Sequence, residues 1–116
     1  MLLTWAAILF AIAALLGATM ATLHFLGKTP PPIALALLHG VFVISGLALL
    51  LGAVWPGFSG RATWALGLFG LAALGGLTLA LGRHARGKPL PSWMVVGHGA
   101  FALLAFVILL TAVFAA

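Results

Sequence analysis

The chain is organised by the stretch HFLGKTPPPIALALLHG at residues 24–40, which has a counterpart, HARGKPLPSWMVVGHG, at residues 84–99. In each copy one histidine closes an apolar run, and a second histidine lies a little way into the next apolar run. Between the two histidines lies a short basic turn with several prolines, and proline inside a turn ends one helix and can open the next. The pattern therefore predicts two helical hairpins, each with a histidine-bearing turn.

The composition is that of an integral membrane protein. Hydrophobic residues make up 66% of the chain and charged residues only 4%, and the mean hydropathy is +1.38. Crossing the hydrocarbon core of a bilayer takes about 20 apolar residues, and runs of that length recur along the sequence. We predict an all-α fold of four transmembrane helices in an up-down bundle, with spans at about 3–26, 33–54, 62–82 and 92–115.

Several function classes are excluded by residues that the chain lacks. It contains no Asp or Glu and no Cys. This removes carboxylate acid–base catalysis, thiolate chemistry, covalent haem attachment through thioethers and the intramembrane carboxylate of many ion-coupled transporters. The five Lys and Arg residues flank apolar runs, so they indicate membrane topology and lipid contact rather than a nucleic-acid surface. The chain is expected to be a non-catalytic subunit rather than an enzyme.

The two halves of the chain match beyond the histidines. Thr4-Trp5-Ala6 recurs as Thr63-Trp64-Ala65, and ordered Phe, Gly and Thr matches follow along the first and third apolar runs. We therefore interpret residues 1–116 as one membrane domain of two tandem two-helix repeats, 1–58 and 59–116. An even number of spans in each repeat would make the copies parallel, with a pseudo-two-fold axis along the membrane normal.

Charge distribution predicts the orientation. Basic residues favour the cytoplasmic side of a membrane, and four of the five belong to the histidine-bearing turns: Lys28, Arg83, Arg86 and Lys88. Both turns are thus expected in the cytoplasm, with both termini outside, and the expected location is a bacterial inner membrane.

The four histidines differ in depth. His24 and His84 lie near helix ends, whereas His39 and His98 lie about two turns in, or ~9–10 Å. Because the second and fourth helices of an up-down bundle are diagonal partners, His39 and His98 are expected to face each other at equal depth. Two imidazoles on opposite sides of a planar cofactor suit haem b, whose iron they would saturate as axial ligands in an electron-transfer centre.

Other residues are assigned around this expected haem. Gly40, Gly46 and Gly99 would leave room for the porphyrin, and Phe42 and Phe101, three residues after each histidine, would pack on it. The propionates would meet the basic residues of the turns, which are Lys28, Arg83, Arg86 and Lys88. His24 and His84 would bind the propionates or a quinone head group.

At the level of architecture the chain resembles the membrane b-type cytochromes, in which a four-helix bundle ligates haem through histidines on facing helices. The resemblance covers the helix count and the positions of His39 and His98. Those families often place a second haem near the opposite surface, where this sequence has no histidine. One haem on one side implies a partner, such as other membrane subunits of a respiratory or photosynthetic complex.

Two other functions remain open from the sequence. The chain can be a cofactor-free accessory subunit packed by its glycine-rich faces against larger membrane partners, since small residues let membrane helices approach closely. Alternatively, the histidines hold a pigment, a quinone or a metal ion. Bacteriochlorophyll takes one histidine per pigment, so that variant predicts independent sites rather than one shared site.

Overall fold

A computed structural model describes residues 1–27 and 31–115, and in these ranges the chain forms four long helices and one short 3-10 helix, η1. The elements in order are α1 (Leu2–Phe25), α2 (Ile33–Val54), α3 (Gly60–Gly82), η1 (His84–Arg86) and α4 (Ser92–Ala115). The four helices expected from the sequence are present, and α3 begins two residues before the expected position. The 3-10 turn was not expected.

The helix ends follow from the turn residues. After α1, Gly27 adopts a positive φ of 74°, and its N–H bonds to the carbonyl of His24, as in a C-terminal helix cap. Pro32 precedes α2 and Pro91 precedes α4, and both accept hydrogen bonds from the first turn of the helix that follows. Prolines are well suited to these positions because they need no N–H partner there.

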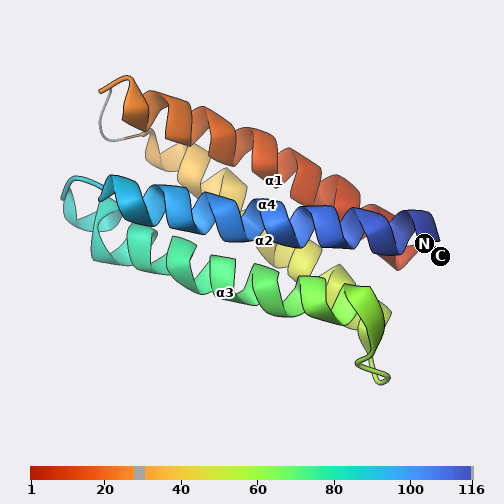
Figure 1. Ribbon diagram of the computed structural model, residues 1–116. Helices are drawn as coiled ribbons and strands as arrows, with labels where there is room; N and C mark the ends of the chain where they lie inside the picture. Colours follow the sequence, from red (N-terminus) through yellow and green to blue (C-terminus); the bar gives the residue numbers. More distant parts are fainter. Residues whose placement is uncertain (28–30, 116) are drawn as a thin grey trace.

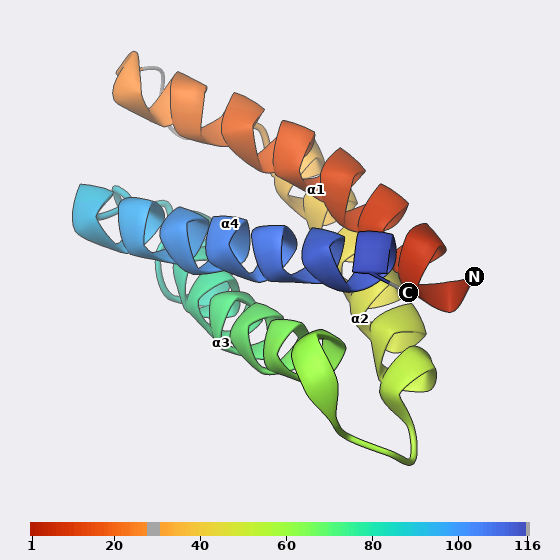
Figure 2. The same ribbon diagram turned by 45° about the vertical axis from the view of Figure 1, so that its right-hand side comes forward.

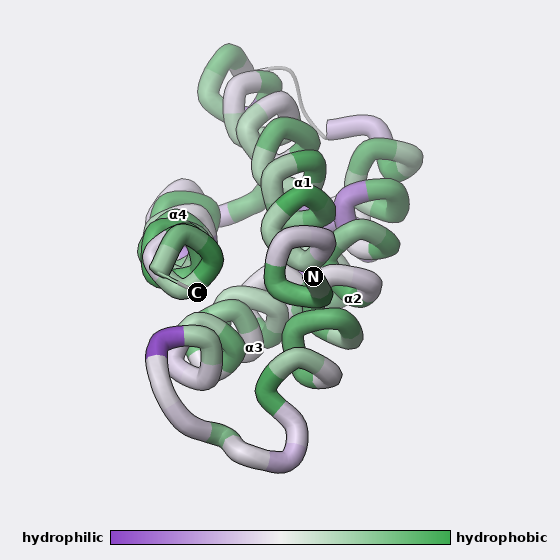
Figure 3. Tube along the Cα trace, turned by 90° about the vertical axis from the view of Figure 1, so that its right-hand side faces the viewer, coloured by the Kyte–Doolittle hydropathy of each residue, from purple (hydrophilic) through white to green (hydrophobic). Residues whose placement is uncertain are grey.

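The helices alternate in direction and form an elongated bundle of 42 × 21 × 20 Å with both termini at one end (Figure 1). α1 packs against α2 and α4, and α3 packs against α4 and α2. The view along the bundle in Figure 3 accordingly shows α1 opposite α3 and α2 opposite α4. Each of the four long helices is long and apolar enough to cross a membrane, and much of their outer surface consists of exposed Leu, Ile, Val, Phe and Trp side chains.

The tightly packed core lies toward the end that holds the termini. Its fully buried members include Leu50 and Leu109, both 0% exposed, at corresponding depths of α2 and α4. The rings of Phe10 and Phe69 stack between α1 and α3, with centroids 3.7 Å apart and planes within 3°. Toward the other end, α1 and α4 diverge (Figures 1 and 2), and most of the buried hydrophobic residues lie in the half of the bundle that holds the termini.

Candidate functional site

His39 and His98 lie next to each other inside the bundle. They come from the diagonal helices α2 and α4, and their ring centroids are 6.2 Å apart with an angle of 76° between the planes. Both side chains are half-buried. His39 and His98 were expected to face each other at equal depth on the second and fourth helices, and in the structure their rings do lie close together.

Each of the two imidazoles is held by a backbone carbonyl of the preceding helix. Nδ1 of His39 is 2.8 Å from the carbonyl oxygen of Ala13, and Nδ1 of His98 is 2.6 Å from that of Ala72. A carbonyl can only accept, so Nδ1 carries the proton in both rings. In the neutral ring, Nε2 then keeps a free lone pair. This is the arrangement of metal-ligating histidines, whose second ring nitrogen usually donates to a carbonyl, a carboxylate or water.

Two glycines give the imidazoles their space. A Cβ atom on Gly17 would lie 3.1 Å from Cε1 of His39, and a Cβ atom on Gly76 would lie 2.8 Å from Cε1 of His98. Gly17 and Gly76 are each one turn beyond the residue that accepts the hydrogen bond. Any larger residue at these positions would therefore push the ring away from the carbonyl that orients it.

The aromatic stack lies next to this site in the sequence of α1 and α3, on the side of the chain termini. Phe10 lies one turn before Ala13 on α1, and Phe69 lies one turn before Ala72 on α3. The ring of Phe10 also rests on Gly46 of α2, where a Cβ atom would be only 3.0 Å from Cζ. The space beside Gly46, which was expected to leave room for a porphyrin, is thus taken by the ring of Phe10.

The shallower histidines are arranged differently from the deep pair. Nε2 of His24 is 3.0 Å from Oγ of Ser92, which links the end of α1 to the start of α4. Nδ1 of His24 is buried and, within the described residues, has no hydrogen-bond partner. His84 begins η1 and is half-buried. In the second half of the chain, no hydrogen bond between described side chains corresponds to that between His24 and Ser92.

The remaining sequence candidates on α2 and α4 are at least partly exposed. Phe42 is half-buried and Phe101 is 47% exposed. A Cβ atom on Gly40 or Gly99 would meet no atom within 4 Å, so these glycines border open space.

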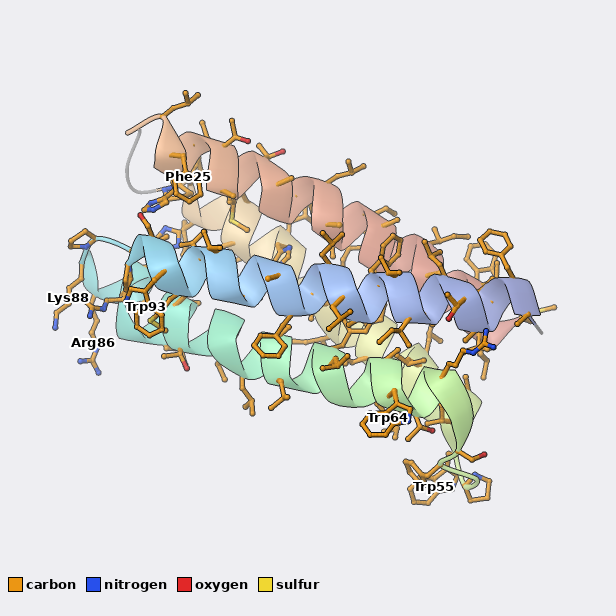
Figure 4. All side chains as sticks on the ribbon, in the orientation of Figure 1. Phe25, Trp55, Trp64, Arg86, Lys88 and Trp93 are labelled. Atoms are coloured by element: carbon orange, nitrogen blue, oxygen red, sulfur yellow. The ribbon has the colours of Figure 1, made fainter. Side chains whose placement is uncertain are left out.

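The basic candidates lie at the end of the bundle. Arg83, Arg86 and Lys88 are exposed, and Figure 4 shows Arg86 and Lys88 extending away from the helices. Lys28 lies outside the described residues.

Four residues that orient the imidazoles were not identified from the sequence. They are Ala13, Gly17, Ala72 and Gly76. A signal was present, because the Ala-x3-Gly spacing occurs in both halves. A small residue followed by another small residue four positions on is a common way for membrane helices to approach closely. What it does not reveal is which side chain of the neighbouring helix fills the space.

Two imidazoles supply only two ligands, so a metal bound between them would have to receive its other ligands from a cofactor. Among the described residues, no group of three or more His, Cys, Asp or Glu side chains is arranged to hold an ion. Imidazole nitrogens bind metals at ~2.0–2.1 Å, so two of them on opposite sides of one metal have ring centres roughly 6 Å apart. The observed 6.2 Å fits such a pair. The spacing of the two rings therefore meets one condition for a shared metal, namely the distance between two imidazoles on opposite sides of it.

Compared with models of known protein families, with curated proteins and with solved structures, the chain gives no match.

Proposed function

We propose that this chain is a small integral membrane subunit that binds haem b between His39 and His98 and takes part in electron transfer. The membrane location is supported by four helices long and apolar enough to cross a bilayer. It is also supported by a surface of exposed apolar side chains, which would be unfavourable in water over so large an area.

We further propose that the bundle is built from two tandem two-helix repeats. The observation that supports this is the equal spacing of equivalent contacts. Each histidine bonds to an alanine carbonyl 26 positions earlier, and each lies beside a glycine of that same helix. The second set of these residues follows the first by 59 positions, both for His39 and His98 and for the alanines, the glycines and the stacked phenylalanines.

The single observation that carries the haem proposal is the paired imidazole geometry. Two rings, each with Nδ1 bonded to a carbonyl, lie 6.2 Å apart across the bundle axis. His39 and His98 would hold the haem, and the haem would supply a one-electron couple suited to electron transfer rather than to oxygen binding.

The chain's own residues would position and insulate the site. The carbonyls of Ala13 and Ala72 fix the tautomer and the direction of each ring, and Gly17 and Gly76 allow the rings to reach them. Phe10 and Phe69 form a stacked apolar pair on the side of the chain termini, which would limit access of water from that side. Positions held in this way need little rearrangement when the charge of the site changes.

The positive-inside rule places the histidine-bearing end at the cytoplasmic face of a bacterial inner membrane, with both termini outside. A single centre near one face cannot by itself carry electrons across the bilayer. We therefore propose that other membrane subunits, or a quinone near His24, supply or accept the electrons.

One observation favours a second candidate, a cofactor-free accessory subunit. The outer face of α3 has an apolar hollow lined by Thr63, Trp64, Gly67, Leu68 and Leu71, and Trp64 projects from that face in Figure 4. A helix of a larger membrane partner would fit against Gly67. A pair of independent pigment sites is less favoured, because the two imidazoles lie together rather than in separate pockets.

The test is the optical spectrum of the protein purified in detergent after expression with ample haem, recorded oxidised and then dithionite-reduced. The proposal predicts the sharp α and β bands of a low-spin b haem in the reduced protein, and their loss in the His39→Ala, His98→Ala double variant. The His24→Ala, His84→Ala double variant is the matched control and should keep the bands. A spectrum without visible bands would refute the haem proposal and favour the accessory subunit.

A further inference from the structure

The positive charges of the chain have little within the chain to balance them. The sequence has five Lys and Arg residues and no Asp or Glu. Arg61 has a protein partner, because its Nη1 donates to the carbonyl oxygen of Thr111 at 3.3 Å. Within the described residues, no side-chain hydrogen bond involves the other three cations, Arg83, Arg86 and Lys88, and all three are exposed. Their counter-charge has to come from another molecule.

The backbone gathers these three cations on one compact turn. The N–H of Arg86 bonds to the carbonyl of Arg83 at 3.1 Å, and the N–H of Lys88 bonds to the same carbonyl at 2.9 Å. Gly87 makes this reversal possible with a positive φ of 66°, a conformation that glycine adopts readily. The turn thus carries three like charges within six consecutive residues, and an anion that bound there would reduce their mutual repulsion.

The turn also lies beside an apolar surface suited to acyl chains. Trp93, at the start of α4, is 76% exposed, and Leu81 in the last turn of α3 and Val96 in the second turn of α4 are 60% and 58% exposed. Figure 4 shows Arg86, Lys88 and Trp93 at the same end of the bundle. Tryptophan favours the level of lipid head groups, so the cations and the apolar surface match the two parts of a phospholipid.

We propose that the turn at residues 83–88 is a binding site for the head group of an anionic glycerophospholipid. The phosphate accepts hydrogen bonds from the guanidinium groups of Arg83 and Arg86 and from the ammonium group of Lys88, and the acyl chains lie along α3 and α4. Guanidinium groups bind phosphate oxygens in pairs and with directional preference. This site does not require any cofactor, and it gives Arg83, Arg86 and Lys88 a partner other than the haem propionates to which the sequence analysis assigned them.

The experiment is a titration of the detergent-purified protein with phosphatidylglycerol, in which native mass spectrometry counts the bound lipids. Each Lys or Arg near an anionic surface contributes about 1 kcal/mol, which is about a fivefold change in affinity. The Arg83→Gln, Arg86→Gln, Lys88→Gln variant should therefore bind roughly 100-fold more weakly. Arg61→Gln removes a charge at the other end of the bundle and should bind within about twofold of the original chain.

Further measurements distinguish a phospholipid site from a general effect of charge and from a site for free anions. Phosphatidylcholine should bind far more weakly than phosphatidylglycerol to the unaltered chain, which tests the site without any substitution. Arg83→Lys with Arg86→Lys keeps the charge but loses the paired guanidinium hydrogen bonds, so it should bind more weakly than the original chain and more tightly than the triple variant. The proposal is overturned if Arg61→Gln weakens binding as much as the triple variant, or if the triple variant binds normally. Displacement of the lipid by an equal concentration of inorganic phosphate would also overturn it, since a free-anion site would then explain the data.

Discussion

Replacing Gly76 by alanine should disturb the pair His39 and His98, because a side chain at Gly76 would collide with the ring of His98. The new Cβ atom would lie 2.8 Å from Cε1 of His98 and 3.4 Å from both ring nitrogens. Carbon atoms in contact normally stay about 3.5–4.0 Å apart. The imidazole must therefore move by roughly 0.7 Å or more, which draws Nδ1 away from the carbonyl of Ala72.

The change in the free energy of unfolding for Gly76→Ala combines two destabilising contributions and one stabilising contribution. Forcing an extra carbon into a packed site costs about 1–3 kcal/mol, and losing the hydrogen bond of His98 costs about 0.5–1.5 kcal/mol. Alanine in place of glycine stabilises a helix interior by about 1 kcal/mol. Gly99→Ala is the matched control, because a Cβ atom there meets nothing within 4 Å and it receives the same helix gain. The two variants should thus differ by about 1.5–4.5 kcal/mol in the free energy of unfolding.

The assay is unfolding in mixed micelles by titration with SDS, followed by far-UV circular dichroism. Gly76→Ala should unfold at a lower SDS fraction than the unaltered chain, and Gly99→Ala at an equal or higher fraction. Gly17→Ala should fall between them, because its Cβ atom would be 3.1 Å from the ring of His39. The reasoning is refuted if Gly76→Ala is as stable as Gly99→Ala.

Three further outcomes are expected from the packing. Leu50→Ala should lower the free energy of unfolding by about 2–5 kcal/mol because the side chain is 0% exposed, whereas Leu103→Ala, at 64% exposed, should change it by less than about 1 kcal/mol. In a double-mutant cycle, Phe10→Ala and Phe69→Ala should show a coupling of about 0.5–1.5 kcal/mol for their stacked rings, and strict additivity would contradict the stack. His24→Ala should lower stability by less than about 1.5 kcal/mol, the value of one partly exposed hydrogen bond to Ser92, and a larger loss in the SDS titration would give His24 a structural role.

The four helices could be predicted from the sequence because apolar length and proline-bearing turns determine them directly. The same holds for the closeness of His39 and His98. Once short turns make neighbouring helices antiparallel, equal depth on diagonal helices brings the two side chains to the axis.

The contacts that orient these rings could not be predicted in the same way. Whether the ring of His39 reaches the carbonyl of Ala13 depends on how closely α1 and α2 approach and on the rotation of each helix. Hydropathy barely changes around helices that are apolar on every side, so it carries little information about rotation. The repeat pattern also does not predict the hydrogen bond between His24 and Ser92. The two residues belong to different halves of the chain, and in the first half Ile33 occupies the position that corresponds to Ser92.

The central claim is that His39 and His98 bind one cofactor together. The measurement that tests it most directly is a haem titration of the purified apoprotein, followed at the Soret band, with His39→Ala and His98→Ala examined as separate single variants. The account predicts one haem for each chain and the loss of the low-spin, six-coordinate spectrum when either histidine is removed. Two independent sites would instead leave about half of the binding in each single variant, and an unchanged low-spin spectrum in either one would contradict the shared site.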